Sequence, residues 1–278
     1  MKVSFETPLC LLKESLMYND YQYVLPHHID LYPEYKEFIL NYRKIKNSFI
    51  IADNGLFENV NHTHEDLIEK INLIKPDIFI TPDVWNNATQ TLVNAKYWKN
   101  VMLKQLPSNT NLMAVIQATT IDEAETLYIN LVDLGFKYIA FNHSSVLYES
   151  IFPHPNKLVS QMMGRILLIN TLANKKIINK NIHHHLLGCS LHQEFAYYED
   201  QPYIKSVDTS NPITYAIEFG DYDDFKEIQK PKLKIDDIME TKLGKSDYLE
   251  IQNNILKFNK KVFNGKNKYF TLNATKTK

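Results

Sequence analysis

The chain has 278 residues, of which 44% are hydrophobic, and its formal net charge is −1 at pH 7. It has two cysteines and no apolar stretch near the ~20 residues of a membrane-spanning helix, which disfavours a disulfide scaffold and a transmembrane protein. The N-terminus lacks the basic, apolar and small-residue order of a signal peptide, so we expect a cytoplasmic protein, in the host cytoplasm if the source is viral.

Short apolar segments rich in β-branched and aromatic residues recur along the chain and predict eight strands. They are residues 2–8, 21–28, 49–55, 78–84, 112–118, 137–142, 183–188 and 203–208. Between some of them, residues 62–75, 121–135 and 156–176 have apolar side chains at helical spacing. Strands that alternate with helices predict a parallel sheet.

The predicted fold class is α/β, a (β/α)8 TIM-type barrel without a zinc subdomain. The length suits a closed barrel of ~250 residues. An open doubly wound sheet is the competitor, but it usually carries a glycine-rich first turn, and this chain has seven glycines and no G-x-G-x-x-G. We expect the barrel at residues 1–215 and a C-terminal extension at 216–278, with a helix near 248–257 and a basic tail.

Polar side chains follow several predicted strands at the point where each strand ends. Asp53, Asp83 and Asp208 each close an apolar run, and Gln117 and Asn142 hold the corresponding position in two others. An aspartate after a strand often only caps a helix or forms a turn. In a ring of parallel strands, however, the C-terminal ends open into one mouth. The repetition therefore predicts one shared active site.

The residue types at these strand ends suit chemistry on a purine nucleoside. The Asp83 carboxylate can accept two N–H bonds from the N1 and N2 edge of guanine, while the Gln117 amide can donate to O6 or N7. Asp53 and Asp208 then remain for the reaction. Two carboxylates that flank a glycosidic bond can act by retaining substitution, in which one attacks the anomeric carbon and the other moves the proton.

The order of these motifs resembles the tRNA-guanine transglycosylase superfamily, whose members exchange guanine for a 7-deazaguanine without breaking the sugar-phosphate backbone. Residues 53–57 resemble its D-S-G-G-F/Y segment, and Asp83 and Gln117 match its base-reading aspartate and its V-Q-G glutamine. Residues 185–188 resemble its Y-L-M-G segment, and Asp208 matches the aspartate that closes the eighth strand. The resemblance extends to about residue 215 and lies in the ordering of the motifs.

The resemblance implies a role for each matched residue. Asp208 would be the nucleophile, and Asp53 would be the general acid and base. Phe57 and Leu187 would hold the base between apolar faces, and Gly188 would line the same pocket.

Departures from the family pattern indicate which branch the chain resembles. Leu56 and Ala118 stand where the family has glycine, so the pocket dimensions differ. The tRNA-modifying members carry a structural zinc subdomain of three cysteines and a histidine, which a chain with two cysteines cannot build. The D-N-G-x-F-E and S-V-D-x-S segments, at residues 53–58 and 206–210, are closer to the DNA 7-deazaguanine transglycosylases of bacteria and bacteriophages.

The resemblance thus implies a pentosyltransferase that replaces guanine in DNA by a 7-deazaguanine through a covalent aspartyl-glycosyl intermediate. The expected partners are DNA, with tRNA as the alternative, and a free base such as 7-cyano-7-deazaguanine. No cofactor, metal or membrane is expected, and a homodimer is compatible with the family.

Charge is unevenly distributed along the chain. Residues 151–193 have five basic and no acidic residues, and residues 251–278 have seven lysines and no acid. This pattern fits a phosphate backbone lying across one side of the molecule, or a solvated helix face and a frayed tail. The predicted nucleic-acid contacts are Lys157, Arg165, Lys175, Lys176 and Lys180.

Other readings stay open beside the DNA enzyme. One is a tRNA transglycosylase without the zinc module, and another is a noncatalytic nucleic-acid-binding homologue. The third is an unrelated metal-dependent barrel enzyme, for which His27, His28, His143 and His192 are candidate ligands near strand ends. Strand alternation separates the run at 183–185 between two faces, so a single metal would not collect all three of its histidines.

Overall fold

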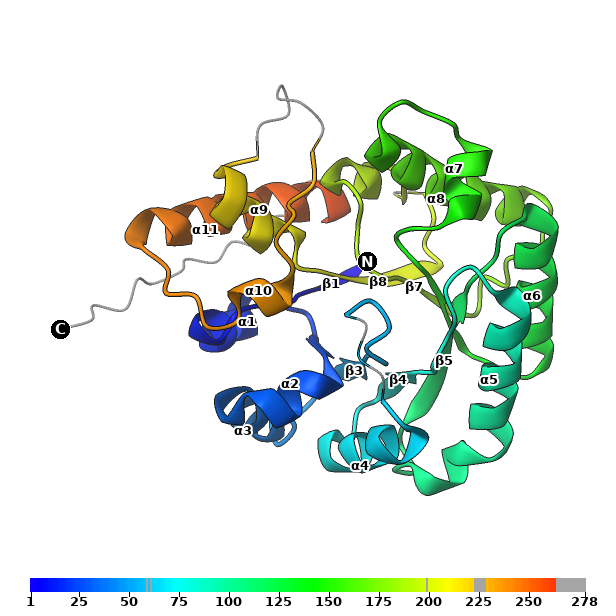
Figure 1. Ribbon diagram of the computed structural model, residues 1–278, viewed down its shortest axis with the longest axis horizontal. Helices are drawn as coiled ribbons and strands as arrows, with labels where there is room; N and C mark the ends of the chain where they lie inside the picture. The colour runs from blue at the N-terminus through cyan, green and yellow to red at the C-terminus, as the bar shows by residue number, and fades with distance from the viewer. Residues whose placement is uncertain (59, 61, 199, 223–228, 264–278) are drawn as a thin grey trace.

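The computed structural model describes residues 1–58, 60, 62–198, 200–222 and 229–263. Its centre is one sheet of eight parallel strands in the order β1-β8-β7-β6-β5-β4-β3-β2, curled into a nearly closed barrel (Figure 1). Each predicted strand segment overlaps one strand, so the predicted strands are confirmed, with β5 starting one residue earlier and β8 ending one residue later than predicted. The strands are β1 (Lys2–Phe5), β2 (Gln22–Val24), β3 (Ile50–Ala52), β4 (Ile78–Ile80), β5 (Asn111–Ile116), β6 (Tyr138–Phe141), β7 (His183–Leu186) and β8 (Ile204–Thr209).

Helices lie outside the strands and connect successive ones (Figure 1). In the part of the chain that the structure describes, no helix combines the length and apolarity needed to cross a bilayer. The α-helices are α1 (Leu12–Tyr18), α2 (Pro26–Leu31), α3 (Pro33–Tyr42), α4 (His64–Ile74), α5 (Ala88–Asn100), α6 (Ile121–Asp133), α7 (Val146–Ile151), α8 (Lys157–Asn174), α9 (Asn211–Phe219), α10 (Ile235–Ile238) and α11 (Lys245–Phe263). Short 3₁₀ helices occur at Leu9–Leu11, Met102–Gln105 and His192–Tyr198.

Between β1 and β2 the barrel is bridged by side-chain and single backbone hydrogen bonds rather than by a regular ladder. The Ser4 hydroxyl accepts a hydrogen bond from the backbone N–H of Tyr23 at 2.9 Å. The Asp20 carboxylate accepts from the N–H of Val3 at 2.9 Å, and the Asp20 N–H donates to the carbonyl of Val3 at 2.8 Å. Buried backbone groups need such partners because leaving them unpaired costs as much as a lost hydrogen bond.

Helix α4 illustrates how the sequence sets the helical layer. Leu67, Ile71 and Ile74 recur at helical spacing and are buried against the barrel, as predicted. The helix begins at a capping box in which the side chains and backbone N–H groups of Thr63 and Asp66 bond each other reciprocally.

Helices α7 and α8 approach each other closely because α8 carries a glycine at the contact. A Cβ on Gly164 would lie 2.3 Å from the carbonyl oxygen of Tyr148, a residue of α7. A glycine inside a helix costs about 1 kcal/mol relative to alanine, so its presence here reflects the space available.

The C-terminal region packs on the barrel. The predicted boundary after residue 215 falls inside α9, which continues to Phe219. The predicted helix at 248–257 forms the middle of α11, whose Phe258 packs with ring centroids 5.3 Å from Phe5 and 4.9 Å from Phe195. The part of the predicted basic tail beyond residue 263 lies outside the described residues.

We predict that Gly164→Ala destabilises the protein, although alanine is normally the better helix former. The added methyl group would force α7 and α8 apart, and we expect a loss of about 1–3 kcal/mol in the free energy of unfolding. Urea denaturation of both proteins measures it. Lys96→Ala, at an exposed position inside α5, is the control and should change stability by less than about 0.5 kcal/mol. A stabilised Gly164→Ala variant would contradict the close contact.

Candidate active site

A cavity of about 250 Å³ opens at the C-terminal ends of the strands. This is the end of a parallel barrel at which active sites are built. Every residue that the sequence predicts as catalytic or substrate-binding contributes to its wall, from six strand ends and the loop after β3. These residues are Asp208, Asp53, Asp83, Gln117, Phe57, Leu187, Gly188 and Asn142.

Asp208 lies near the end of β8 and is held by two hydrogen bonds. His185 Nε2 bonds Oδ1 at 2.8 Å, and the backbone N–H of Gly188 donates to Oδ2 at 3.2 Å. Burial lowers the pKa of His185 to about 3, which favours the neutral ring. The Nδ1 atom lies within hydrogen-bond distance of the Ser206 hydroxyl, at 2.8 Å. Burial and the neighbouring Asp53 raise the pKa of Asp208 well above its usual value.

Asp53 follows β3 in a tight turn. Its Oδ2 accepts from the backbone N–H of Gly55 at 3.3 Å, and Gly55 has a φ of +82°, which glycine adopts without strain. The Tyr23 hydroxyl and the backbone N–H groups of Asn54 and Gly55 act to lower the pKa of Asp53. Burial nevertheless raises the pKa of Asp53, which favours the protonated form that a general acid needs.

Asp83 and Gln117 belong to one hydrogen-bonded network. Asn54 Nδ2 donates to Asp83 Oδ1 at 2.8 Å, and Gln117 Nε2 donates to Oδ2 at 2.7 Å. Gln117 Oε1 accepts from Asn142 Nδ2 at 3.0 Å and from the N–H of Asn86 at 3.1 Å. Burial raises the pKa of Asp83 to about 6, although the two amide donors oppose the shift. The network fixes the orientation of both side chains toward the cavity.

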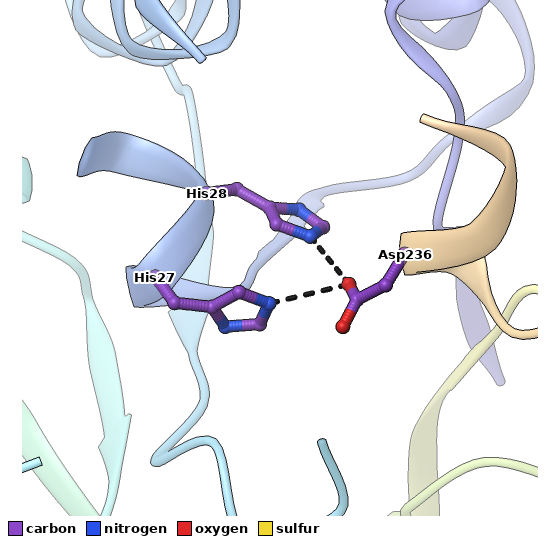
Figure 2. Close-up of side chains that lie close together, drawn as sticks. All are labelled: His27, His28 and Asp236. Atoms are coloured by element: carbon purple, nitrogen blue, oxygen red, sulfur yellow. Dashed lines mark hydrogen bonds and ion pairs between the residues drawn. The ribbon is translucent and has the colours of Figure 1, made fainter. Parts of the chain in front are cut away.

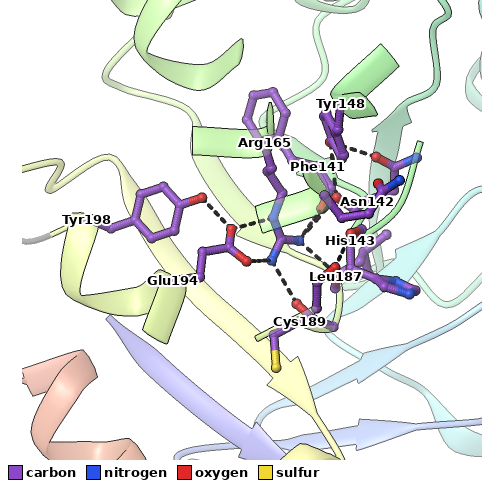
Figure 3. A network of polar contacts seen from close by, with 12 residues as sticks. Phe141, Asn142, His143, Tyr148, Arg165, Leu187, Cys189, Glu194 and Tyr198 are labelled. Atoms are coloured by element: carbon purple, nitrogen blue, oxygen red, sulfur yellow. Dashed lines mark hydrogen bonds and ion pairs between the residues drawn. The ribbon is translucent and has the colours of Figure 1, made fainter. Parts of the chain in front are cut away.

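The prediction that Arg165 contacts nucleic acid is wrong. Its side chain is fully buried in α8 and forms a two-pronged ion pair with Glu194, with Nε–Oε1 at 2.6 Å and Nη2–Oε2 at 2.7 Å (Figure 3). The same guanidinium donates to the carbonyls of Asn142, Leu187 and Gly188 at 3.0–3.1 Å. Arg165 therefore holds the ends of β6 and β7, which carry residues of the cavity wall.

The other predicted phosphate contacts separate along α8. Lys157 begins this helix on the side of the cavity and pairs with Glu149 at 2.9 Å. Lys175, Lys176 and Lys180 follow the end of the helix, which runs about 27 Å back toward the start of β7. Lys175 pairs with Glu125 of α6. None of these three lysines lines the cavity, and their contact with nucleic acid stays a prediction.

Two acidic residues that sequence reasoning missed also line the cavity. Glu6 follows β1, and burial together with Asp208 and Asp53 raises its pKa well above the usual value. Burial, with Asp53 and Glu6, raises the pKa of Glu58 to about 9. The signal for Glu6 was available, because it closes a predicted strand just as Asp53 and Asp83 do.

Residues 229–235, which we call the lid, cover part of the cavity, and sequence reasoning did not identify them. Lys230, Lys232 and Lys234 of the lid all line the cavity. The ammonium groups of Lys230 and Lys234 lie 5.9 and 4.8 Å from the centre of the Phe57 ring. The lid therefore places basic side chains at the cavity. The basic residues predicted from the segment of α8 do not line it.

The histidines proposed as metal ligands do not all meet. His143 lines the cavity with its ring 4.9 Å from that of Phe57, whereas His192 stacks on Tyr222 at 3.8 Å. His27 and His28 meet Asp236 outside the cavity wall.

No protein-family model matches the chain, and no curated protein matches it.

We predict that Arg165→Met destabilises the protein by about 3–5 kcal/mol, because it leaves the Glu194 carboxylate buried and unpaired. Replacing both partners, as Arg165→Met with Glu194→Leu, should restore part of this loss. Chemical denaturation gives the free energies. Lys157→Met breaks an exposed pair and is the control, with an expected cost of about 0–1 kcal/mol. Equal costs for the two single variants would refute the structural role of Arg165.

We predict that Glu58→Gln stabilises the protein increasingly as the pH rises. The pKa of Glu58 is about 9 in the folded chain against about 4.3 when unfolded, so the native protein loses stability as the pH rises between these values. Glutamine removes this loss, and we expect a gain of roughly 5 kcal/mol at pH 8 that vanishes near pH 4. Thermal unfolding across this range tests it. Glu37→Gln, at an exposed position of α3, is the control. An equal gain from Glu58→Gln at pH 4 and pH 8 would show that the titration of Glu58 is not the cause.

Proposed function

We propose that this protein is a base-exchange transglycosylase that replaces guanine in DNA by a 7-deazaguanine. The observation that carries the proposal is the convergence of Asp208, Asp53, Asp83 and Gln117 on one cavity at the barrel mouth. These four residues are those on which the resemblance to the transglycosylases depends.

The network of Asp83 and Gln117 leaves the hydrogen-bonding groups that guanine requires. Each carboxylate oxygen of Asp83 accepts one bond from the protein and has a second acceptor site free. These two sites suit the N1–H and N2–H groups of guanine. Gln117 Oε1 is already occupied by two donors, so its second Nε2 hydrogen is left for O6 or N7. The amide is thereby fixed as a donor toward the base.

Apolar groups of the cavity suit the faces of a purine. Phe57 and Leu187 both line it, as does Trp85. A flipped base would exchange stacking within DNA for contact with these side chains. The cavity volume of about 250 Å³ is close to the lower end of the range for small-molecule sites, about 300 Å³.

The reaction proceeds in two displacements at C1′ of the sugar. An oxygen of the Asp208 carboxylate bonds to C1′ while the C1′–N9 bond breaks. The electron pair of the C1′–N9 bond leaves with guanine, and Asp53 protonates the departing base. The incoming 7-deazaguanine then gives its N9 proton to Asp53 and bonds to C1′, releasing Asp208. The bonds from His185 and Gly188 hold the attacking carboxylate throughout. No cofactor is needed in this scheme.

The lid supports a nucleic-acid substrate. Lys230, Lys232 and Lys234 supply cationic groups at the cavity through which phosphates flanking a flipped nucleotide can be bound. The preference for DNA over tRNA rests on the sequence segments at residues 53–58 and 206–210 and on the lack of cysteines for the zinc subdomain.

We predict that Asp208→Ala reduces the exchange of labelled guanine or 7-cyano-7-deazaguanine into DNA by on the order of 10³-fold or more, because it removes the nucleophile. The assay is run in parallel on duplex DNA, single-stranded DNA and tRNA, which separates the proposed enzyme from the tRNA-modifying alternative. Asp122→Ala, at an exposed position of α6, is the control and should retain activity.

Trapping provides a second readout on the same proteins. The native enzyme should yield a covalent DNA adduct on denaturation, and Asp208→Ala should not. Undiminished exchange by Asp208→Ala would reject the nucleophile. Native protein that binds DNA without exchange or adduct would instead support the noncatalytic homologue.

A further inference from the structure

Two neighbouring histidines and an aspartate converge beside the lid. His28 Nε2 lies 2.6 Å and His27 Nε2 lies 3.2 Å from the same oxygen, Oδ1 of Asp236 (Figure 2). The three ligand atoms all lie within 4.8 Å of one another. His27 and His28 are buried, whereas the Asp236 side chain is 37% exposed. The two histidines of the cluster are thus enclosed by the protein, while the aspartate reaches the surface.

Helix geometry alone does not produce this convergence. Consecutive residues of a helix point about 100° apart and do not normally face a common point. His27 and His28 are consecutive in the first turn of α2, yet both rings turn their Nε2 atoms toward Asp236 (Figure 2). The ring of His28 is held in place by the edges of Tyr32 and Tyr35, each with its centroid 5.4 Å away.

We propose that His27, His28 and Asp236 bind one divalent transition-metal ion, with zinc as the best match. Two imidazole nitrogens and a carboxylate oxygen form a donor set that zinc favours, with a fourth position left for water. Donor atoms about 2.0–2.1 Å from a tetrahedral zinc ion lie about 3.3 Å apart, close to the 3.2 Å between His27 and Asp236. The 2.6 Å separation at His28 requires a small opening to admit the ion.

The position of the cluster indicates a structural role for the ion. None of its three residues lines the cavity, so the ion would not touch the substrate there. Asp236 lies in α10, directly after the lid, while His27 and His28 lie in α2, which follows β2. Bound metal would therefore fasten the lid to the barrel wall, and its occupancy would set how readily the cavity opens.

Metal content of the purified full-length chain tests the site. After treatment with a chelator and dialysis against zinc chloride, we expect one zinc ion per native chain by mass spectrometry. In competition with a chromophoric chelator, His28→Ala and Asp236→Asn should each bind zinc at least about ten- to a hundredfold more weakly. Asp236→Asn keeps the shape of a partly exposed side chain, so it remains informative if loss of the buried His28 ring impairs folding. His154→Ala, at an exposed histidine elsewhere, should bind like the native chain.

The lid supplies a second readout. Zinc should slow tryptic cleavage after the exposed residues Lys232 and Lys234 in the native chain and leave cleavage of Asp236→Asn unchanged. The zinc site would be overturned if the native protein takes up no zinc or if both variants keep the native zinc affinity. His27, His28 and Asp236 would then interact through hydrogen bonds alone. Neither readout depends on base exchange, so failure of the zinc site is distinct from failure of the proposed transglycosylase activity.

Discussion

The mouth of the barrel is governed by the cost of removing carboxylates from water. Asp208, Asp53, Asp83, Glu6 and Glu58 all line one cavity, and burial raises the pKa of each. Ionised carboxylates so placed repel one another, and protonation relieves the repulsion. The surrounding amides, hydroxyls and backbone N–H groups offset part of the cost and direct the side chains. Such a cluster of buried carboxylates lowers the stability of the folded state, and this cost is concentrated at the candidate active site.

A second buried charge supports this mouth from behind. Arg165 and Glu194 neutralise each other in the layer between α8 and the strands, and the guanidinium fork reaches the carbonyls after β6 and β7 (Figure 3). Those carbonyls belong to the segments that contribute Asn142 and Gly188 to the cavity. A hydrophobic pair would fill the same space, but it could not satisfy these carbonyl groups. The ion pair therefore ties the position of the cavity wall to the packing of a single helix.

Local patterns were sufficient for the strands and for the strand-end residues, because side chains at the ends of parallel strands must converge. The sequence of β1 carries the same signal for Glu6, which was overlooked. The charge pattern of the sequence did not predict which basic side chains are exposed. The segment around Arg165 shows a cation, but its buried partner Glu194 lies 29 residues further along the chain. The lid at residues 229–235 follows neither strand nor helix periodicity, so no local rule would have placed it over the cavity.

The lid lies between the cavity and the cluster of His27, His28 and Asp236, which local sequence patterns did not relate to each other. Two of its lysines, Lys230 and Lys234, lie over Phe57, a residue on the loop that also carries Asp53. Its C-terminal end leads into α10, where Asp236 meets the histidines of α2. A polynucleotide that enters the cavity would draw the lysines onto its phosphates, while the Asp236 contacts hold the base of the lid in place. Under the proposed function, the lid lysines would contact the substrate while the Asp236 contacts fix the lid to the barrel, so the strength of those contacts would determine the free energy available for closing over a flipped base.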